Sequence, residues 1–295
     1  MKTKIKSCFP YFGGKSRVAD TIWERFGNVE NYVEPFAGSI AVLLANPNPS
    51  KIETINDIDC YISNFFRALA LDPDNVIKYA DNPVNEADLH ARQTWLLSSS
   101  TNEWRTKMHS DPDHYDSKIA GWWVWGICAS IGTNWLQSKN LNSVPHLSSA
   151  GQGIHGITKD MSEWLNDISK RIRSVRVTCG DWSRVVTKSV TYNSVGLSKD
   201  GITGILLDPP YLLSGRDKVY NVDDDVFTNV CKWAVDNEST KMRIAVCGHD
   251  GTYDFPDTWT KYHWQSNGYG SMGNDRGREN AKKEVIWFSQ SCIKV

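Results

Sequence analysis

The tetrapeptide Asp208-Pro209-Pro210-Tyr211 contains groups that can activate an amino group for reaction. It directly follows an apolar run typical of a buried strand. The lone pair of a nucleobase NH2 group is delocalised into the ring. If a carboxylate and a backbone carbonyl both accept hydrogen bonds from the NH2 group, the lone pair becomes localised on the nitrogen. Asp208 supplies the carboxylate, and Pro209 supplies a carbonyl held by two prolines with fixed φ angles. Tyr211 supplies a ring face for stacking a planar base. We predict a catalytic site here; the alternative is a strand-ending turn.

A second segment, Tyr32-Val33-Glu34-Pro35-Phe36-Ala37-Gly38-Ser39, has the pattern of a strand that turns through a small residue into a helix. Such a turn brings the backbone close to a ligand. The segment lacks the Gly-x-Gly-x-x-Gly motif, so the sequence shows no evident binding loop for the pyrophosphate of a dinucleotide. Another nucleoside ligand fits the pattern, and so does an ordinary turn.

Three shorter segments carry charged groups beside turns. In residues 10–15, paired glycines permit close backbone approach and Lys15 is able to reach a carboxylate, although a solvent-exposed loop with one lysine also fits this pattern. Asp57 and Asp59 follow an apolar run and compete for the ribose hydroxyls of a nucleoside, although either suits a helix N-cap. Asp181 follows another apolar run. Its carboxylate could accept a hydrogen bond from an adenine amino group, or the residue could belong to an ordinary turn.

Short β-rich runs alternate with helical patterns at both ends of the chain, which predicts an α/β fold with a parallel sheet. The predicted strands cover residues 31–34, 51–56, 175–179, 203–207, 243–247 and 284–288, and two of the predicted helices cover 58–71 and 226–235. Residues 81–168 instead combine helical segments with seven of the 13 tryptophans. We therefore predict a catalytic domain of residues 1–80 and 169–295 and a mostly helical inserted domain of residues 81–168.

Composition narrows the class of protein. The 295 residues include 33 basic and 34 acidic side chains, and this net charge of −1 still permits a basic face that binds nucleic acid. Seven scattered cysteines without a Cys-x-x-Cys pair, and histidines without metal-ligand spacing, predict free thiols and no zinc site. No apolar run reaches the ~20 residues of a membrane span, so we expect a cytoplasmic protein. The abundant tryptophan suits a core or a surface that stacks planar ligands.

In their order along the chain these motifs resemble the adenine-N6 DNA methyltransferases of the Dam, or D12, class, including phage-encoded members. The family has a Gly-Gly-Lys segment, a Phe-x-Gly loop, a recognition insertion and Asp-Pro-Pro-Tyr, and the resemblance covers nearly the whole chain. It implies a Rossmann-like methyltransferase sheet with S-adenosyl-L-methionine (AdoMet) as methyl donor. By resemblance, the AdoMet contacts are Tyr11, Lys15, Glu34, Phe36, Gly38, Asp57 with Asp59 as its competitor, and Asp181. This chain departs from the family at Ser39-Ile40, where many members have a second glycine.

Residues expected to touch DNA fall into two sets. Base-edge contacts are expected from the insertion, since amides pair with adenine in the major groove; the candidates are Asn134, Gln137, Lys139 and Asn140. Phosphate contacts are expected from basic residues after the insertion and after the Asp-Pro-Pro-Tyr motif. These candidates are Arg171, Arg173, Arg216 and Lys218, and the last two belong to a predicted loop over a flipped base. The alternative for each set of basic residues is that it only forms a solvent-exposed surface.

The resemblance implies methyl transfer to adenine N6 in double-stranded DNA by base flipping, without a metal ion, in the cytoplasm (of the host cell if phage-encoded). We expect a monomer or weak homodimer, with a role such as restriction-modification. An N4-cytosine or RNA adenine methyltransferase is the alternative of the same fold. A catalytically inert DNA-binding or anti-restriction protein is the alternative of another class. A Cys–His nucleophile at Cys247-Gly248-His249 is disfavoured because Cys247 ends a predicted buried strand.

Overall fold

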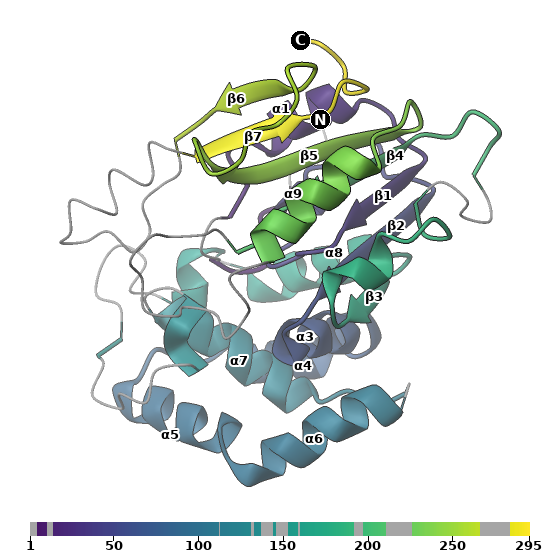
Figure 1. Cartoon of the computed structure of the whole chain (residues 1–295). Coiled ribbons are helices and arrows are strands. Elements are labelled where there is room, and N and C mark those ends of the chain that lie inside the picture. Colours follow the sequence, from purple (N-terminus) through teal and green to yellow (C-terminus); the bar gives the residue numbers. More distant parts are fainter. Residues whose placement is uncertain are drawn as a thin grey trace. The chain divides into compact units, whose positions relative to one another are not determined.

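The chain divides into two compact units, each assembled from separated segments, and Figure 1 shows the trace of both in a computed structural model. The structure describes residues 5–10, 14–111, 113–130, 133–136, 144–145, 153–158, 160–191, 197–210, 226–265 and 284–295, without the side chains of 99–102, 133 and 134. The helical unit comprises Met1–Gly14, Gly38–Leu44 and Asp57–Cys179. The sheet unit comprises Lys15–Ala37, Ala45–Asn56 and Gly180–Val295.

A seven-stranded sheet with the order β3-β2-β1-β4-β5-β7-β6 forms from the described residues. Its strands are β1 (Asn31–Glu34), β2 (Ile52–Asp57), β3 (Arg176–Cys179), β4 (Thr203–Leu207), β5 (Met242–His249), β6 (Thr260–His263) and β7 (Glu284–Phe288). β2, β1, β4 and β5 pair in parallel, whereas β7 runs antiparallel to both β5 and β6. The predicted Rossmann-like α/β fold is therefore confirmed. β6 was not predicted, because its Thr-Lys-Tyr-His sequence has no apolar run.

The helices and 3-10 turns complete the described secondary structure. They are α1 (Ala19–Phe26), α2 (Ala41–Leu44), α3 (Cys60–Leu71), α4 (Pro73–Ala80), α5 (Glu86–Leu96), α6 (Ser99–Ser110), α7 (Ser117–Ala129), η1 (Thr133–Leu136), η2 (Gly153–Gly156), α8 (Met161–Ile172), η3 (Trp182–Val185) and α9 (Val226–Asp236). Within the part of the chain that the structure describes, no helix is both long enough and apolar enough to cross a membrane.

Helices α1 and α9 cover opposite faces of the sheet in the sheet unit. Neighbouring side chains of a strand point to opposite faces, and on β1 the Tyr32 ring packs on Trp23 and Phe26 of α1 with centroids 4.9 and 6.3 Å away. The next residue, Val33, belongs to the apolar cluster of the other face, which includes Phe227 of α9 (Figure 1). Cover on both faces explains why β1 and β4 are buried along their whole lengths and hold their register.

The core of the helical unit is built around α7. Trp123 is buried there with its ring 4.9 Å from that of Phe9. Gly121 permits close packing against α4, because a Cβ at this position would lie 2.7 Å from the Val76 carbonyl oxygen and would also collide with Tyr79. Nine of the 13 tryptophans are buried, so the aromatic surplus serves mainly as core.

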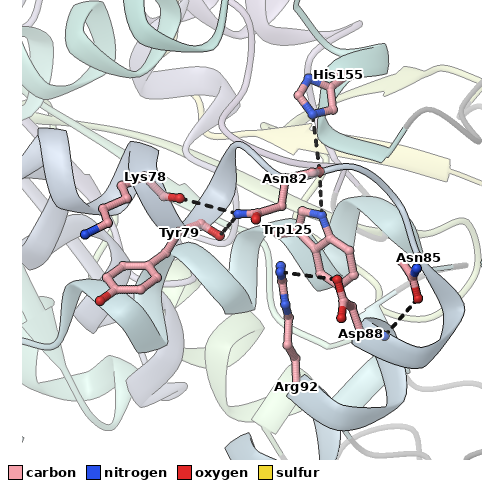
Figure 2. A network of polar contacts seen from close by, with 8 residues as sticks. All are labelled: Lys78, Tyr79, Asn82, Asn85, Asp88, Arg92, Trp125 and His155. Atoms are coloured by element: carbon pink, nitrogen blue, oxygen red, sulfur yellow. Dashed lines mark hydrogen bonds and ion pairs between the residues drawn. The ribbon is translucent and has the colours of Figure 1, made fainter.

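A network of polar contacts fixes the segment between α4 and α5 (Figure 2). The Trp125 indole donates to the Asn82 carbonyl at 2.9 Å, and His155 Nε2 lies 3.3 Å from the same oxygen. The Arg92 guanidinium lies 4.0 Å from the Trp125 ring centroid and 3.7 Å from an oxygen of Asp88. We name these five residues the helical network. It secures the first part of the predicted insertion.

The described secondary structure between residues 81 and 168 is entirely helical, in agreement with the sequence pattern. The 3-10 helix η2 lies in this region, and its Ile154 is buried. The assignment of residues 81–168 to target recognition, with residues 1–80 and 169–295 as catalytic domain, stays a prediction.

Candidate functional site

The sheet unit reverses its strand order beside β1 and β4. β1 pairs in parallel with β2 on one side and with β4 on the other, with Val33 opposite Ile205. Ligands of open α/β sheets bind beyond the carboxyl ends of the strands at such a point. Glu34 ends β1, is 4 % exposed and accepts from the Tyr32 hydroxyl at 3.1 Å; Asp208 directly follows β4. Two predicted site residues therefore lie at the expected sheet edge.

A buried ion pair joins Lys15 to Asp208. Lys15 Nζ donates to Asp208 Oδ2 at 2.8 Å, and the side chains are 3 % and 22 % exposed. Burial lowers the pKa of Lys15, but the Asp208 carboxylate, with Cys247 and Glu284 nearby, raises that pKa above its ordinary value, so the amine stays charged. The sequence predicted a carboxylate partner for Lys15 without identifying it. Pro209 is buried immediately beyond Asp208.

Strands β5 and β7 bring further polar groups to this pair. Glu284 opens β7 opposite His249 at the end of β5, with His249 Nε2 3.9 Å from Glu284 Oε1. Trp264, just beyond β6, places its ring centroid 5.6 Å from Lys15 Nζ. Sequence reasoning missed Glu284 and Trp264, because their approach depends on an antiparallel pairing that a single sequence does not reveal.

Cys247 lies in the same neighbourhood as a fully buried thiol. Burial, followed by the nearby Asp208 carboxylate, raises the pKa of the Cys247 thiol well above its ordinary value. A thiol in this state is a poor nucleophile because the reactive form is the thiolate. The structure therefore agrees with the low weight given to a Cys–His nucleophile.

Asn56 holds the loop after β1 in place and was not singled out from the sequence. Its side-chain amide donates to the carbonyls of Pro35 at 3.0 Å and Gly180 at 2.9 Å, and its backbone carbonyl accepts from Ala37 at 2.9 Å. An amide only 1 % exposed at a strand end is a signal for such a positioning role. The loop presents Phe36, whose ring stacks on Trp182 with centroids 6.2 Å apart and planes 26° apart.

In the helical unit, Asp57 at the end of β2 and Asp59 just after it have different roles. Asp57 Oδ2 accepts from the Gly38 N–H and its Oδ1 from the Asp59 N–H, both at 3.0 Å. Asp59 caps α3 by accepting from Tyr61 N–H at 2.8 Å. Burial raises the pKa of Asp57 to about 7 against the opposing effect of its backbone donors. Gly38 has φ +46°, a conformation that favours glycine.

Other predicted residues have simpler surroundings. Asp181 is exposed and caps η3 through Ser183 N–H at 2.9 Å. Arg171, in the last turn of α8, donates to the Leu43 carbonyl at 3.1 Å, whereas Arg173 is exposed. The remaining predictions, Tyr11, Gln137, Lys139, Asn140, Tyr211, Arg216, Lys218 and the side chain of Asn134, fall outside the described residues.

A Rossmann-like sheet with acids at the carboxyl ends of its central strands is typical of α/β enzymes that bind nucleotides, and it is consistent with a methyltransferase fold. The family model for D12 class N6 adenine-specific DNA methyltransferase matches residues 11–224, and the chain belongs to this family. A comparison with curated proteins found no match. D12 methyltransferases take the methyl group from AdoMet and place it on adenine N6 in DNA.

Proposed function

We propose that this enzyme methylates adenine N6 at specific sites in double-stranded DNA, with the target base flipped to the end of β4. The observation that carries the proposal is Asp208, which stands beyond β4 at the reversal of strand order and is held by a buried lysine. A base within the duplex stack is out of reach of such a group, so the target nucleotide must swing out.

The groups around Lys15 fit the cofactor. Trp264 Nε1 is buried and has no hydrogen-bond acceptor among the described residues. Its N–H and the Lys15 ammonium, both in the sheet unit, suit the carboxylate of an amino acid moiety. Asp57 suits the ribose hydroxyls, and the Phe36 ring suits the adenine face. The proposed AdoMet residues are Tyr11, Lys15, Glu34, Phe36, Gly38, Asp57 with Asp59 as its competitor, and Asp181.

AdoMet, when bound, supplies a methyl group on a sulfonium with a good neutral leaving group. Asp208 accepts a hydrogen bond from the N6 amino group and so localises its lone pair. The Pro209 carbonyl accepts the second N–H, and the Pro209-Pro210 pair limits the movement of that carbonyl. Tyr211 stacks on the base. Lys15 holds Asp208 in position, and Asp208 Oδ2 is the first acceptor for the proton that the nitrogen loses.

DNA recognition is assigned to the inserted residues 81–168. The proposed base-edge contacts are Asn134, Gln137, Lys139 and Asn140, and the proposed phosphate contacts are Arg171, Arg173, Arg216 and Lys218. Of the two described arginines, Arg173 is the more available to a phosphate, because Arg171 already donates to Leu43. The transfer step itself is proposed to use no metal ion, since positioning and exclusion of water suffice for an in-line displacement.

Nucleoside mass spectrometry of unmethylated duplex DNA, treated with the enzyme and AdoMet with and without excess EDTA, tests the proposal. We expect N6-methyladenine in both reactions. N4-methylcytosine would reassign the base, and methylation of RNA alone would reassign the substrate. Binding of DNA without release of S-adenosylhomocysteine would identify an inert DNA-binding protein. Strict dependence on a divalent ion, in protein that stays folded in EDTA, would contradict the metal-free transfer step.

A further inference from the structure

Three potential metal ligands meet in the helical unit near Asp57 and Asp59, and none of the three is itself assigned to AdoMet binding or methyl transfer. Cys60 opens α3, His109 lies near the end of α6 and Cys179 ends β3. Cys60 Sγ is 3.4 Å from His109 Nε2 and 3.6 Å from Cys179 Sγ, and the three atoms lie within 4.8 Å of one another. Among the described residues this is the one cluster of histidine, cysteine and acidic side chains with such spacing.

The spacing is that of a tetrahedral zinc site. With Zn–S near 2.3 Å and Zn–N near 2.05 Å, a tetrahedral angle separates two sulfurs by about 3.8 Å and a sulfur from a nitrogen by about 3.6 Å. The measured separations of 3.6 and 3.4 Å are each about 0.2 Å shorter, so an ion fits with a slight expansion of the cluster. We propose that Cys60, His109 and Cys179 bind one Zn²⁺ through two thiolates and an imidazole, with water as fourth ligand.

Exposure and charge support this assignment. The other five cysteines are buried, whereas Cys60 and Cys179 are half-buried and His109 is exposed, so an ion can enter from solvent. As zinc ligands the two neighbouring sulfurs would be thiolates, and a divalent cation would balance the charge of the pair. Binding releases to solvent the protons that the two thiols still carry. Neither the cluster nor its charge balance depends on the proposed methyl transfer.

The sequence did not reveal this site. Its ligands are separated by 49 and 70 residues, so the spacing of a zinc finger is absent, and we predicted no zinc site for that reason. The ion would join α3, α6 and β3 within one unit. Because it links three elements, the ion would raise the melting temperature of the protein, and the proposed transfer step does not use it.

Metal binding by the full-length, reduced protein tests the proposal. Protein stripped by a chelator is titrated with Zn²⁺ against a chromophoric chelator, and with Co²⁺ to detect thiolate-to-cobalt charge-transfer absorption. We expect one equivalent of Zn²⁺ with a Kd tighter than about 1 μM, the charge-transfer band, and a higher melting temperature with zinc. Cys60→Ser and Cys179→Ser should each weaken binding by on the order of 10²-fold or more and abolish zinc stabilisation.

Matched variants separate the cluster from other ligands. Cys292→Ser removes a buried thiol in the sheet unit and His90→Gln removes a histidine on α5, and both should bind zinc as the wild type does. His109→Gln should weaken binding at least tenfold. Circular dichroism checks that each variant is folded. Equal zinc binding by all variants, or none by the folded wild type, would overturn the proposal. So would a Cys60–Cys179 disulfide in the purified protein that persists under mild reductant.

Discussion

Two regions of the molecule are both polar and partly buried: the strand-end site around Lys15 and Asp208, and the helical network around Trp125. They differ in the charge and the hydrogen bonding of their polar groups. In the helical network the Trp125 and His155 rings meet one backbone carbonyl, and Arg92 lies on an aromatic face with Asp88 beside it. In the strand-end site a buried ammonium and carboxylates lie close together, and the Trp264 N–H has no acceptor among the described residues.

This difference indicates that the helical network stabilises the fold and that the strand-end site serves ligand binding and catalysis. The helical network stabilises the fold through neutral hydrogen bonds and packing on aromatic rings, although Arg92 Nη1 has no hydrogen-bond partner among the described residues. The strand-end site instead combines a buried ammonium and carboxylates with an unsatisfied donor, which costs free energy that a ligand can recover. Substitutions at the strand ends should therefore impair catalysis or ligand binding more than folding. Substitutions in the helical network should do the opposite.

The largest effect is expected for Asp208→Ala. Loss of the acceptor that localises the lone pair should reduce kcat by on the order of 10²–10³ or more, because the bond is made chiefly in the transition state. AdoMet affinity should stay within roughly tenfold of the wild type. Steady-state methylation of duplex DNA and calorimetric AdoMet binding measure the two quantities. Equal losses in both would mean that Asp208 acts on the cofactor rather than on the base.

An intermediate effect is expected for Asp57→Asn, in AdoMet affinity. Two hydroxyls donating to an ionised carboxylate should contribute about 10- to 100-fold. Since the pKa of Asp57 is raised to about 7, the protonated acid predominates below this pH, and affinity should increase as pH rises from 6 to 8. Calorimetry across this range should show the increase in the wild type and its absence in Asp57→Asn. Unchanged affinity in Asp57→Asn, with a loss in Asp59→Asn, would transfer the role to Asp59.

The smallest effect on the reaction is expected for Trp125→Phe. The change removes the indole hydrogen bond to Asn82 and part of the packing surface, and should lower the free energy of unfolding by about 1–2 kcal/mol. Denaturant unfolding measures this loss, and methylation below the transition should proceed at the wild-type rate. A strongly reduced kcat with unchanged stability would remove the distinction between the two regions.

The sequence predicted the parts of the molecule in which local pattern and chemistry coincide. The strand before Asp208 is a continuous apolar run with an acid at its end, so both the strand and the acid beyond its carboxyl end were evident from the sequence. β6 and Trp264 were missed because their placement follows from pairing with β7, a contact distant in the chain. The backbone donors of Asp57 and the capping role of Asp59 were not predicted, because no side-chain pattern encodes them, and the choice between the two acids for the ribose stays a prediction.

The central claim is that Asp208 acts on the target base in the chemical step. Single-turnover methylation with enzyme, AdoMet and duplex DNA all saturating tests it most directly, because neither binding nor product release limits the observed rate. The matched control is Asp200→Ala, which removes an exposed acid from the turn before β4. We predict a wild-type rate for Asp200→Ala and a rate lower by on the order of 10²–10³ or more for Asp208→Ala. A near-normal rate for folded Asp208→Ala would show that Asp208 is only a turn residue and would contradict the proposed mechanism.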